Sequence, residues 1–287
     1  MDAKCHLFLA IVFLVNFAIG VCGMYIETDE NEFSNIRSLN YRQAVSDIGN
    51  IWQQDLQVMF EYLNPQQGDV VLEIGSGSGF FSFPIADALS DRGHLFVTDP
   101  SEEQLKPVLD SIRPNMTVFV QGAENISLGE NQPLINKIWS RGAFHHVKNK
   151  TTAFSRWRQL VIAHAKMVIF DIFSHNDTAY FFDAFVSRVC VTGHEVAFLS
   201  KAFAESLCAR TGWCSPVFHD IPLRWRFDSE EKLGGFLALL LANQPRYSAK
   251  DSLNAAYKYL GVHETVHGVE LDWPMTVMVA EASDVTQ

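Results

Sequence analysis

One segment, VVLEIGSGSGF at residues 70–80, constrains the fold of this chain more than any other. Its apolar start predicts a buried strand. The glycines that follow at alternate positions, Gly75, Gly77 and Gly79, predict a tight turn that leads into a helix. Glycines let the backbone approach a ligand closely, and the first turn of a helix offers free N–H groups. The segment therefore predicts a ligand site at the end of a strand.

A second acid indicates what kind of ligand binds there. Asp99 follows Gly79 by 20 residues and ends a second apolar run, residues 95–98. A carboxylate at the end of a neighbouring strand can accept hydrogen bonds from both hydroxyls of a ribose. We therefore predict a site for an adenosine-containing cofactor, and not a glycine turn that only shapes a corner of the fold.

The spacing of the glycines narrows the choice of cofactor. The third glycine comes one residue earlier than in the dinucleotide fingerprint G-x-G-x-x-G, and Phe80 fills the expected position. Glu73 precedes the first glycine by two residues, where a carboxylate would repel a diphosphate. It would suit a cation such as the ammonium group of a methionine moiety.

On these residues the chain resembles the class I S-adenosylmethionine-dependent methyltransferases from about Asp69 to its C-terminus. Later segments agree with the resemblance: a third strand at 116–121, a fourth strand and loop at 137–147 with a histidine pair, and a fifth strand at 166–171. The resemblance implies an α/β, doubly wound, Rossmann-like fold. Its mostly parallel seven-stranded sheet would have helices on both faces, an antiparallel C-terminal edge and a helical cap insertion.

The resemblance also implies the site residues. S-adenosyl-L-methionine would be bound by the two acids, the glycine loop and the loop after the third strand: Glu73, Gly75, Ser76, Gly77, Gly79, Asp99, Ala123 and Glu124. His145 or His146 could deprotonate an acceptor, since a neutral imidazole titrates near working pH. We expect at least one of the two to have a structural role instead. Asp171, at the end of the fifth strand, is a further candidate.

The N-terminus indicates the secretory pathway. An apolar run from Leu7 to Cys22 follows Lys4, and it is shorter than the ~20 residues that span a membrane. Small residues at Gly20 and Gly23 offer cleavage positions. We predict a signal peptide at 1–23, with a retained signal anchor as the alternative. Four N-x-S/T sequons agree with translocation and predict a glycoprotein: Asn115, Asn125, Asn149 and Asn176.

Three further predictions concern the organisation of the chain. Residues 24–68 are expected to form a helical segment, and 69–287 the methyltransferase domain, whose last part, Glu264 to Ala280, is expected to form paired strands that close the sheet. Two helices are expected as an insertion at about 173–216, with aromatic stripes that serve either as ordinary core or as a lid over an apolar substrate. Cys208 and Cys214 could form a disulfide, and free thiols are the equal alternative.

Charge and composition restrict the partners. The chain of 287 residues has a formal net charge of −11, which argues against a nucleic-acid substrate. We expect a small-molecule acceptor, no nucleic acid, no metal, and no stable membrane insertion if the signal is cleaved. Oligomeric state is not indicated.

A competing motif must be weighed against the methyltransferase hypothesis. His263-Glu264-x-x-His267 matches the zinc-protease pattern H-E-x-x-H. That chemistry requires a helix, but Gly261 and Gly268 bracket the motif and its centre is β-branched, which predicts a strand. We therefore predict methyl transfer to an oxygen, nitrogen or sulfur nucleophile. The alternatives are a nucleoside-binding protein without turnover and, less favoured, a secreted zinc metalloprotease.

Overall fold

The computed structural model describes residues 36–47, 51–193 and 196–284. The predicted signal peptide and both of its cleavage positions lie outside the described residues. Within the described ranges, no helix combines the length and the hydrophobicity that a membrane crossing requires.

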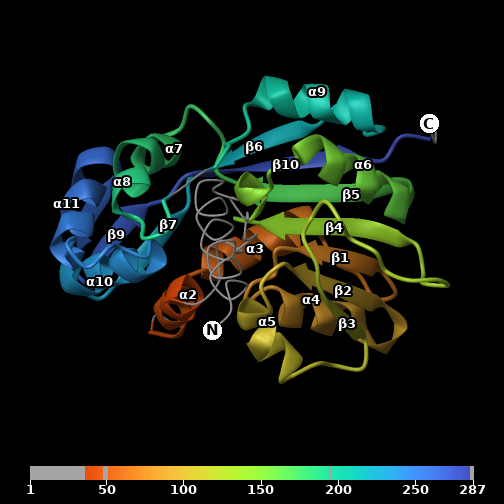
Figure 1. Ribbon diagram of the computed structural model, residues 1–287, viewed down its shortest axis with the longest axis horizontal. Coiled ribbons are helices and arrows are strands. Elements are labelled where there is room, and N and C mark those ends of the chain that lie inside the picture. Colours follow the sequence, from red (N-terminus) through yellow and green to blue (C-terminus); the bar gives the residue numbers. More distant parts are fainter. Residues whose placement is uncertain (1–35, 48–50, 194–195, 285–287) are drawn as a thin grey trace, which may run out of the picture. The chain divides into compact units, whose positions relative to one another are not determined.

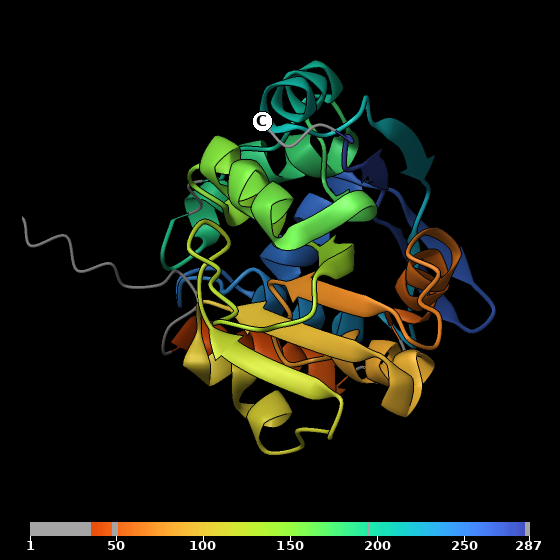
Figure 2. The same cartoon turned by 90° about the vertical axis from the view of Figure 1, so that its right-hand side faces the viewer.

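The main sheet has seven strands in the order β3-β2-β1-β4-β5-β10-β6 (Figure 1). Its strands are β1 (Val70–Ile74), β2 (His94–Asp99), β3 (Met116–Val120), β4 (Ile135–Arg141), β5 (Val161–Asp171), β6 (Val217–Ile221) and β10 (Met275–Glu281). The first five strands pair in parallel, and β10 runs antiparallel to both of its neighbours. The predicted sheet is confirmed, with the antiparallel strand lying between β5 and the edge strand β6. Figure 2 shows the twist of the sheet: successive strands, from the yellow β3 through the orange β1 to the green β5, are rotated against one another.

Helices cover both faces of this sheet. The helices are α3 (Gln53–Tyr62), α4 (Ser82–Leu89) and α5 (Glu102–Leu109) on one face, and α6 (Lys150–Leu160) and α9 (Lys201–Thr211) on the other. Successive side chains of β1 point to opposite faces of the sheet, and the apolar core is divided in the same way. Val71 belongs to the apolar cluster that contains Ile85 of α4, whereas Leu72 belongs to the cluster that contains Trp157 of α6. Ser101 caps α5, because its side chain accepts the N–H of Gln104 at 3.2 Å.

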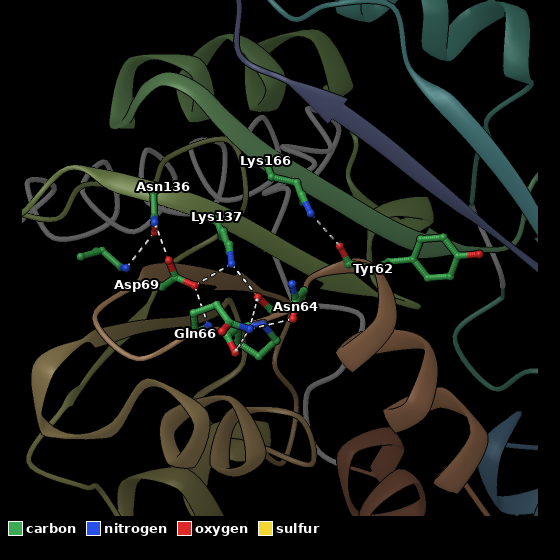
Figure 3. Close-up of polar contacts among 9 residues, drawn as sticks. Tyr62, Asn64, Gln66, Asp69, Asn136, Lys137 and Lys166 are labelled. Atoms are coloured by element: carbon green, nitrogen blue, oxygen red, sulfur yellow. Dashed lines mark hydrogen bonds and ion pairs between the residues drawn. The ribbon is translucent and has the colours of Figure 1, made fainter.

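A polar network joins the amino ends of the neighbouring strands β1 and β4 (Figure 3). The carboxylate of Asp69 accepts hydrogen bonds from Asn136 Nδ2 at 2.7 Å and Lys137 Nζ at 2.6 Å. The Asn136 side chain in turn accepts the N–H of Val70 at 2.8 Å. Although burial opposes ionisation of Asp69, Lys137 and the hydrogen bonds hold the pKa of this carboxyl below its usual value. The network therefore adds side-chain links to the backbone pairing of β1 with β4 at their amino ends.

A second, three-stranded antiparallel sheet lies apart from the first, in the order β7-β9-β8. Its strands are β7 (Arg224–Phe227), β8 (Val262–Thr265) and β9 (Gly268–Asp272). Around it lie α7 (Asp177–Phe181), the π-helical turn η3 (Phe182–Val186), α8 (Ser187–Val189), α10 (Glu230–Leu240) and α11 (Ala249–Tyr259) (Figure 1). We call these elements, residues 177–189 and 224–272, the cap region. The helix α2 (Ile36–Asp47) contacts α10 and α5.

Two expectations about this part of the chain were wrong. The segment 173–216 was predicted to be one insertion of two helices, but α9 packs with α6 on the main sheet, and only the part that forms α7, η3 and α8 joins the cap region. The segment from Glu264 to Ala280 was predicted to close the main sheet. Only β10 does so, because β8 and β9 pair with β7 in the second sheet.

Candidate functional site

The glycine loop is fastened to the end of the neighbouring strand β2. The carbonyl oxygen of Thr98 accepts the N–H of Gly75 at 2.8 Å and that of Ser76 at 3.1 Å. The three glycines of the loop have φ values of +70°, +55° and +85°, in the left-handed region that glycine adopts without strain: Gly75, Gly77 and Gly79. The predicted turn between β1 and α4 is therefore present, at the carboxyl end of the sheet.

Gly75 also permits a close approach of two loops. A Cβ atom at this position would lie 2.2 Å from the Cβ of Ala143, in the loop that follows β4. The loop after β4 thus lies directly against the glycine loop, which brings the histidine pair to the same end of the sheet as the predicted cofactor site.

Asp99 ends β2 beside the glycine loop, as predicted. Its Oδ2 accepts the N–H of Gly77 at 2.9 Å, and its Oδ1 accepts that of Ser101 at 2.9 Å. Burial raises the pKa of Asp99 to about 6, and the two backbone hydrogen bonds oppose this rise. Each oxygen has a second lone pair, so the carboxylate can still accept hydrogen bonds from a ligand.

Glu73 lies beneath the loop, with only 2% of its surface exposed. Its Oε2 accepts a hydrogen bond from the hydroxyl of Ser82, at the start of α4. Burial raises the pKa of Glu73 to about 8; Ser82 opposes this rise and the Asp99 carboxylate adds to it. The predicted contact of Glu73 with a ligand ammonium group stays a prediction.

The raised pKa of Glu73 makes the stability of the fold dependent on pH. Between its ordinary pKa of 4.5 and about 8, the folded state retains a proton that the unfolded state releases, so this group lowers the free energy of unfolding as pH rises through that window. Glu73→Gln imitates the protonated acid. We expect its melting temperature, relative to that of the native chain, to increase from pH 5 to pH 8.

Calorimetric melting curves across this pH range test the expectation. The exposed Glu130→Gln serves as the control variant, because its carboxylate lies on a surface loop. A difference between Glu73→Gln and the native chain that stays constant with pH would show that Glu73 is ionised in the folded state.

Three buried polar atoms lie around the glycine loop without hydrogen-bond partners in the described part of the chain. They are Ser76 Oγ, Trp52 Nε1 and Ser140 Oγ. Trp52 contacts the loop through Phe80, with ring centroids 5.2 Å apart, and Ser140 lies opposite Ile74 in the β1–β4 pair. Buried polar atoms without partners are costly in a folded protein. They therefore fit a polar ligand at the carboxyl end of β1, together with the glycine cradle and Asp99.

The loop after β3 is held by contacts of its own. Ala123 is buried, and its carbonyl oxygen accepts the indole N–H of Trp157 at 2.9 Å. Glu124 accepts the N–H of Asn149 at 3.1 Å, which connects this loop to the start of α6. The predicted cofactor contacts of Ala123 and Glu124 stay predictions.

Tyr41 of α2 lies over the glycine loop. Its Cε1 atom would be 3.9 Å from a Cβ at Gly77, and its ring centroid is 6.0 Å from that of Trp52. Burial raises the pKa of Tyr41 to about 12; Arg141 opposes the rise, and the carboxylates of Asp99 and Asp55 add to it. The helix α2 thus covers the loop through Tyr41, and Trp52 is part of the buried core.

A buried ion pair that the sequence did not indicate lies beside this site. Arg141, the last residue of β4, donates from Nε to Asp55 Oδ1 at 2.9 Å, and Asp55 is fully buried in the first turn of α3. The guanidinium carbon lies 5.1 Å from the ring of Trp52 and 5.9 Å from that of Trp225 on β7. The pair connects α3 and β4 with the cap region.

The histidine pair occupies the turn η2 (Phe144–His146), directly after β4. His145 is buried, and its Nδ1 lies 2.6 Å from Asp171 Oδ1 at the end of β5. His146 is half-buried, and its ring centroid lies 4.1 Å from that of His145. The structure therefore joins two of the predicted residues, His145 and Asp171, in a hydrogen-bonded pair.

The comparisons agree with this geometry. Residues 71–162 match a family model described as a methyltransferase domain. No curated protein matches the chain in sequence. The protein YcgJ of Bacillus subtilis has a similar structure, with a TM-score of 0.59 and 12% identity over 81% of this chain and 100% of its own. This is the class I methyltransferase fold.

Two other solved structures with this methyltransferase fold had ligands bound. Phosphoethanolamine N-methyltransferase 2 of Haemonchus contortus was solved with phosphomonomethylethanolamine and S-adenosylhomocysteine. It gives a TM-score of 0.61 at 15% identity, over 89% of this chain and 59% of its own length. Mycolic acid cyclopropane synthase CmaA1, solved with SAH, gives 0.54 at 14% identity, over 80% of this chain and 83% of its own. At these identities the likeness concerns the methyltransferase fold.

The competing zinc motif does not form a metal site on this methyltransferase fold. His263 and Glu264 lie in strand β8, and His267 follows in the turn to β9, as the flanking glycines predicted. The His263 ring instead pairs with Asp272, with Nε2 2.7 Å from Oδ2. Among the described residues, no three His, Cys, Asp or Glu side chains gather closely enough to hold a metal ion.

The cysteines and the sequons can also be placed. Cys208 and Cys214 are free thiols in the structure, which was the alternative to a disulfide between them. The amide nitrogen of Asn115 donates to the carbonyl oxygen of Ala86 at 2.8 Å, and that of Asn176 donates to Pro274 at 3.2 Å. Asn125 and Asn149 are exposed. Glycosylation stays a prediction, and it is sterically easiest at the two exposed sites: Asn125 and Asn149.

Proposed function

We propose that the chain is an S-adenosylmethionine-dependent methyltransferase that acts on a small-molecule oxygen, nitrogen or sulfur nucleophile. The observation that carries the proposal is the joint placement of Asp99 and the glycine loop at the carboxyl ends of β1 and β2. In open α/β sheets, ligands bind outside the carboxyl ends of the strands. The methyltransferase-domain match and the bound S-adenosylhomocysteine of the Haemonchus enzyme support the same cofactor.

The residues present would divide the binding between them. Asp99 would accept the ribose hydroxyls, and the glycine loop with Ser76 Oγ would approach the methionine portion. When bound, the cofactor supplies a methyl group that its sulfonium already activates. The protein's task is to align donor and acceptor and to exclude water, so few catalytic side chains are needed.

The net charge of −11 supports a small acceptor over a nucleic acid, because phosphate recognition needs a basic surface. The apolar run before Gly23 supports a position in the secretory pathway, with signal anchoring as the other arrangement. Sequencing the N-terminus of the chain purified from a eukaryotic host, with and without glycosidase treatment, tests both the cleavage and the glycans.

Calorimetric titration with S-adenosylhomocysteine tests the cofactor site, and Asp99→Asn sharpens the test. A hydrogen bond to a charged group contributes about 1.5–3 kcal/mol, and each 1.4 kcal/mol corresponds to a factor of about ten. We expect Asp99→Asn to bind S-adenosylhomocysteine about 10- to 100-fold more weakly. Affinity of the native chain should also fall from pH 7 to pH 5, because the pKa of Asp99 is about 6 and hydroxyl donors favour its ionised form.

Asp110→Asn is the control, since this carboxylate is exposed at the end of α5. The proposal is overturned if the native chain does not bind S-adenosylhomocysteine at high micromolar concentration. If Asp99→Asn and Asp110→Asn bound S-adenosylhomocysteine with equal affinity, Asp99 would not contact the cofactor. Binding without methyl transfer, in a screen of labelled donor and host extract by mass spectrometry, would favour a binding protein over an enzyme.

A further inference from the structure

The fold uses the four sequon asparagines in two different ways. An N-linked sugar is attached to the side-chain nitrogen Nδ2, so the hydrogen bonds of this atom decide whether a folded chain can carry the sugar. The hydroxyl of the third sequon residue shows in addition whether the segment is open to solvent or is part of the folded core. The pattern N-x-S/T treats all four positions alike, whereas the structure does not.

Asn115 is held by both hydrogens of its side-chain amide. Nδ2 donates to the carbonyl oxygen of Ala86 at 2.8 Å and to that of Ser90 at 2.7 Å. Ala86 lies in the last turn of α4, where carbonyl oxygens lack partners within the helix. The hydroxyl of Thr117, the third residue of the sequon, lies 2.9 Å from Nε2 of His94. A sugar on Nδ2 would replace one of the two N–H groups and leave a carbonyl oxygen without its donor.

The contact with Ser90 supports a strained turn. Ser90 follows α4 with φ +57° and ψ −164°, a conformation that is unfavourable for residues other than glycine. Such a conformation persists only where surrounding contacts fix it, and Asn115 supplies one of them. The amide of Asn115 is therefore part of the structure at the end of α4.

Asn176 is also used by the fold, at the start of α7. Its Oδ1 accepts the N–H of Ala179 at 2.7 Å and so caps this helix, while Nδ2 donates to the carbonyl oxygen of Pro274 at 3.2 Å. Thr178, the third residue of the sequon, is fully buried, and its hydroxyl donates to the same carbonyl oxygen at 3.1 Å. Both ends of this sequon are thus fixed against the segment that leads into β10.

The other two sequons are open to solvent. Their asparagines and third residues are exposed, and the described structure gives no partner to either Nδ2 or to either hydroxyl: Asn125, Ser127, Asn149 and Thr151. Asn149 uses only its Oδ1, which accepts the N–H of Thr152 at 2.9 Å and caps α6. A sugar on Nδ2 of Asn149 leaves this cap in place.

The two open sequons belong to segments that are fastened to each other. Glu124 accepts the N–H of Asn149 at 3.1 Å, and Arg156 of α6 donates from Nε to the carbonyl oxygen of Ile126 at 2.5 Å. The loop after β3 is therefore attached to α6 on both sides of Asn125. Because a glycan is bulky and hydrated, sugars on both asparagines would cover this surface and keep protein partners away from it.

We propose that the folded, exported chain carries N-linked glycans at Asn125 and Asn149, and that Asn115 and Asn176 are structural asparagines without sugar. In the transfer, Nδ2 forms a bond to the anomeric carbon of a lipid-linked oligosaccharide and releases a proton to the host transferase. The bond from that carbon to the pyrophosphate oxygen breaks, and its electron pair stays on oxygen.

The structure selects among the products of this transfer. The host enzyme acts on the chain before it folds, so sugar can reach any sequon. A chain with sugar on Asn115 then lacks a contact that the end of α4 requires, and does not reach the folded state. The inference rests on the proposed entry of the chain into the secretory pathway and is independent of the methyltransferase function.

The first test maps the sugars on the full chain, produced in a eukaryotic secretory host. The exported chain, from the medium or the cell surface, and the chain retained inside the cell are treated with peptide N-glycosidase in heavy-oxygen water. The enzyme converts each glycosylated asparagine to a labelled aspartate, which mass spectrometry locates. We expect label at Asn125 and Asn149 in the exported chain, and label at Asn115 or Asn176 at most in the retained chain.

Two results of this map overturn the proposal. One is label at Asn115 or Asn176 in the exported chain, and the other is a lack of label at Asn125 or Asn149. A lack of label at all four positions would also show that the chain is not translocated. That result leaves the methyltransferase function untouched, because titration with S-adenosylhomocysteine tests it separately.

The second test measures the structural role without any sugar, in chain produced in a bacterium. Asn115→Asp preserves the shape of the side chain but places an oxygen where Nδ2 donates to two carbonyl oxygens. We expect a fall in Tm of at least about 4 °C. The same change at an exposed position, Asn125→Asp, should leave Tm within about 1 °C of the native value. Equal Tm values of the two variants overturn the structural role of Asn115.

Failure of Asn115→Asp to fold, with soluble Asn125→Asp, supports the structural role as a lower Tm does. A further pair of variants reads the sugars without changing an asparagine. Thr151→Ala removes an open sequon and should lower the mass of the exported chain by one glycan, whereas Thr117→Ala should leave the glycan mass unchanged. Loss of a glycan in Thr117→Ala overturns the proposal.

Discussion

Arg141→Met is expected to lower the free energy of unfolding by about 3–5 kcal/mol, because it leaves a buried carboxylate without its cation. Asp55 has no exposed surface, and Arg141 is its ionic partner at 2.9 Å. Methionine retains much of the volume of the side chain but none of its charge. For a chain of this size, such a loss corresponds to a fall in Tm of roughly 6–20 °C, measured by differential scanning calorimetry.

Two further variants identify the cause of the loss. Asp55→Asn combined with Arg141→Met removes the unpaired charge, and we expect it to recover at least half of the lost stability. Lys232→Met breaks an exposed ion pair between Lys232 of α10 and Asp228, which precedes the helix, and should lower the free energy of unfolding by less than about 1 kcal/mol. If Arg141→Met proves as mild as Lys232→Met, or if the double variant is no more stable than the single one, the buried charge does not cause the effect.

The ion pair also shows why part of the site could not be predicted from the sequence. Arg141 and Asp55 are separated by 86 positions, and their partner Trp225 is as distant again, at the start of the second sheet. Nothing in the local pattern of these residues distinguishes a buried ion pair from two solvated charges. A sequence predicts such a pair only when the topology that joins the elements is already known.

Local sequence patterns were sufficient for prediction where residues close together in the sequence determine the structure. The glycine turn was predicted correctly because its conformation depends on residues within ten positions. The position of Asp99 at the end of β2 was predicted correctly because a parallel βαβ unit has a regular length. The helix α9 was misassigned for the opposite reason. An apolar stripe predicts that a helix packs, but not whether it packs on the main sheet or in the cap region.

The pairing of His145 with Asp171 lies between these two cases. Each residue directly follows or ends a predicted strand, and the strands are consecutive in the chain. Because consecutive parallel strands of such a sheet are often neighbours, their carboxyl ends could have been expected to meet. The hydrogen bond of 2.6 Å joins two residues that the sequence had offered as separate candidates.

Gly75→Ala is expected to abolish cofactor binding and to destabilise the fold by about 2–5 kcal/mol. An alanine at φ +70° costs roughly 1–2 kcal/mol, and overpacking adds typically about 1–3 kcal/mol. The added methyl group would lie 2.2 Å from the Cβ of Ala143, so one of the two loops must move. We expect at least a 100-fold loss of affinity for S-adenosylhomocysteine by titration calorimetry, together with a lower Tm.

Gly129→Ala separates the two causes, because Gly129 has a similar φ of +84° but nothing within 4 Å of its would-be Cβ atom. We expect Gly129→Ala to lower the free energy of unfolding only by the backbone strain and to leave cofactor affinity unchanged. Ala143→Gly in the Gly75→Ala background removes the Cβ atom that the new methyl group would contact. We expect this double variant to bind the cofactor within about tenfold of the native affinity, while the backbone strain of alanine at φ +70° still lowers its stability. If Gly75→Ala binds cofactor as the Gly129 variant does, the two loops are not in the contact that this fold requires. If Ala143→Gly restores nothing, the loss arises from the backbone of the glycine loop and not from its packing against the loop after β4.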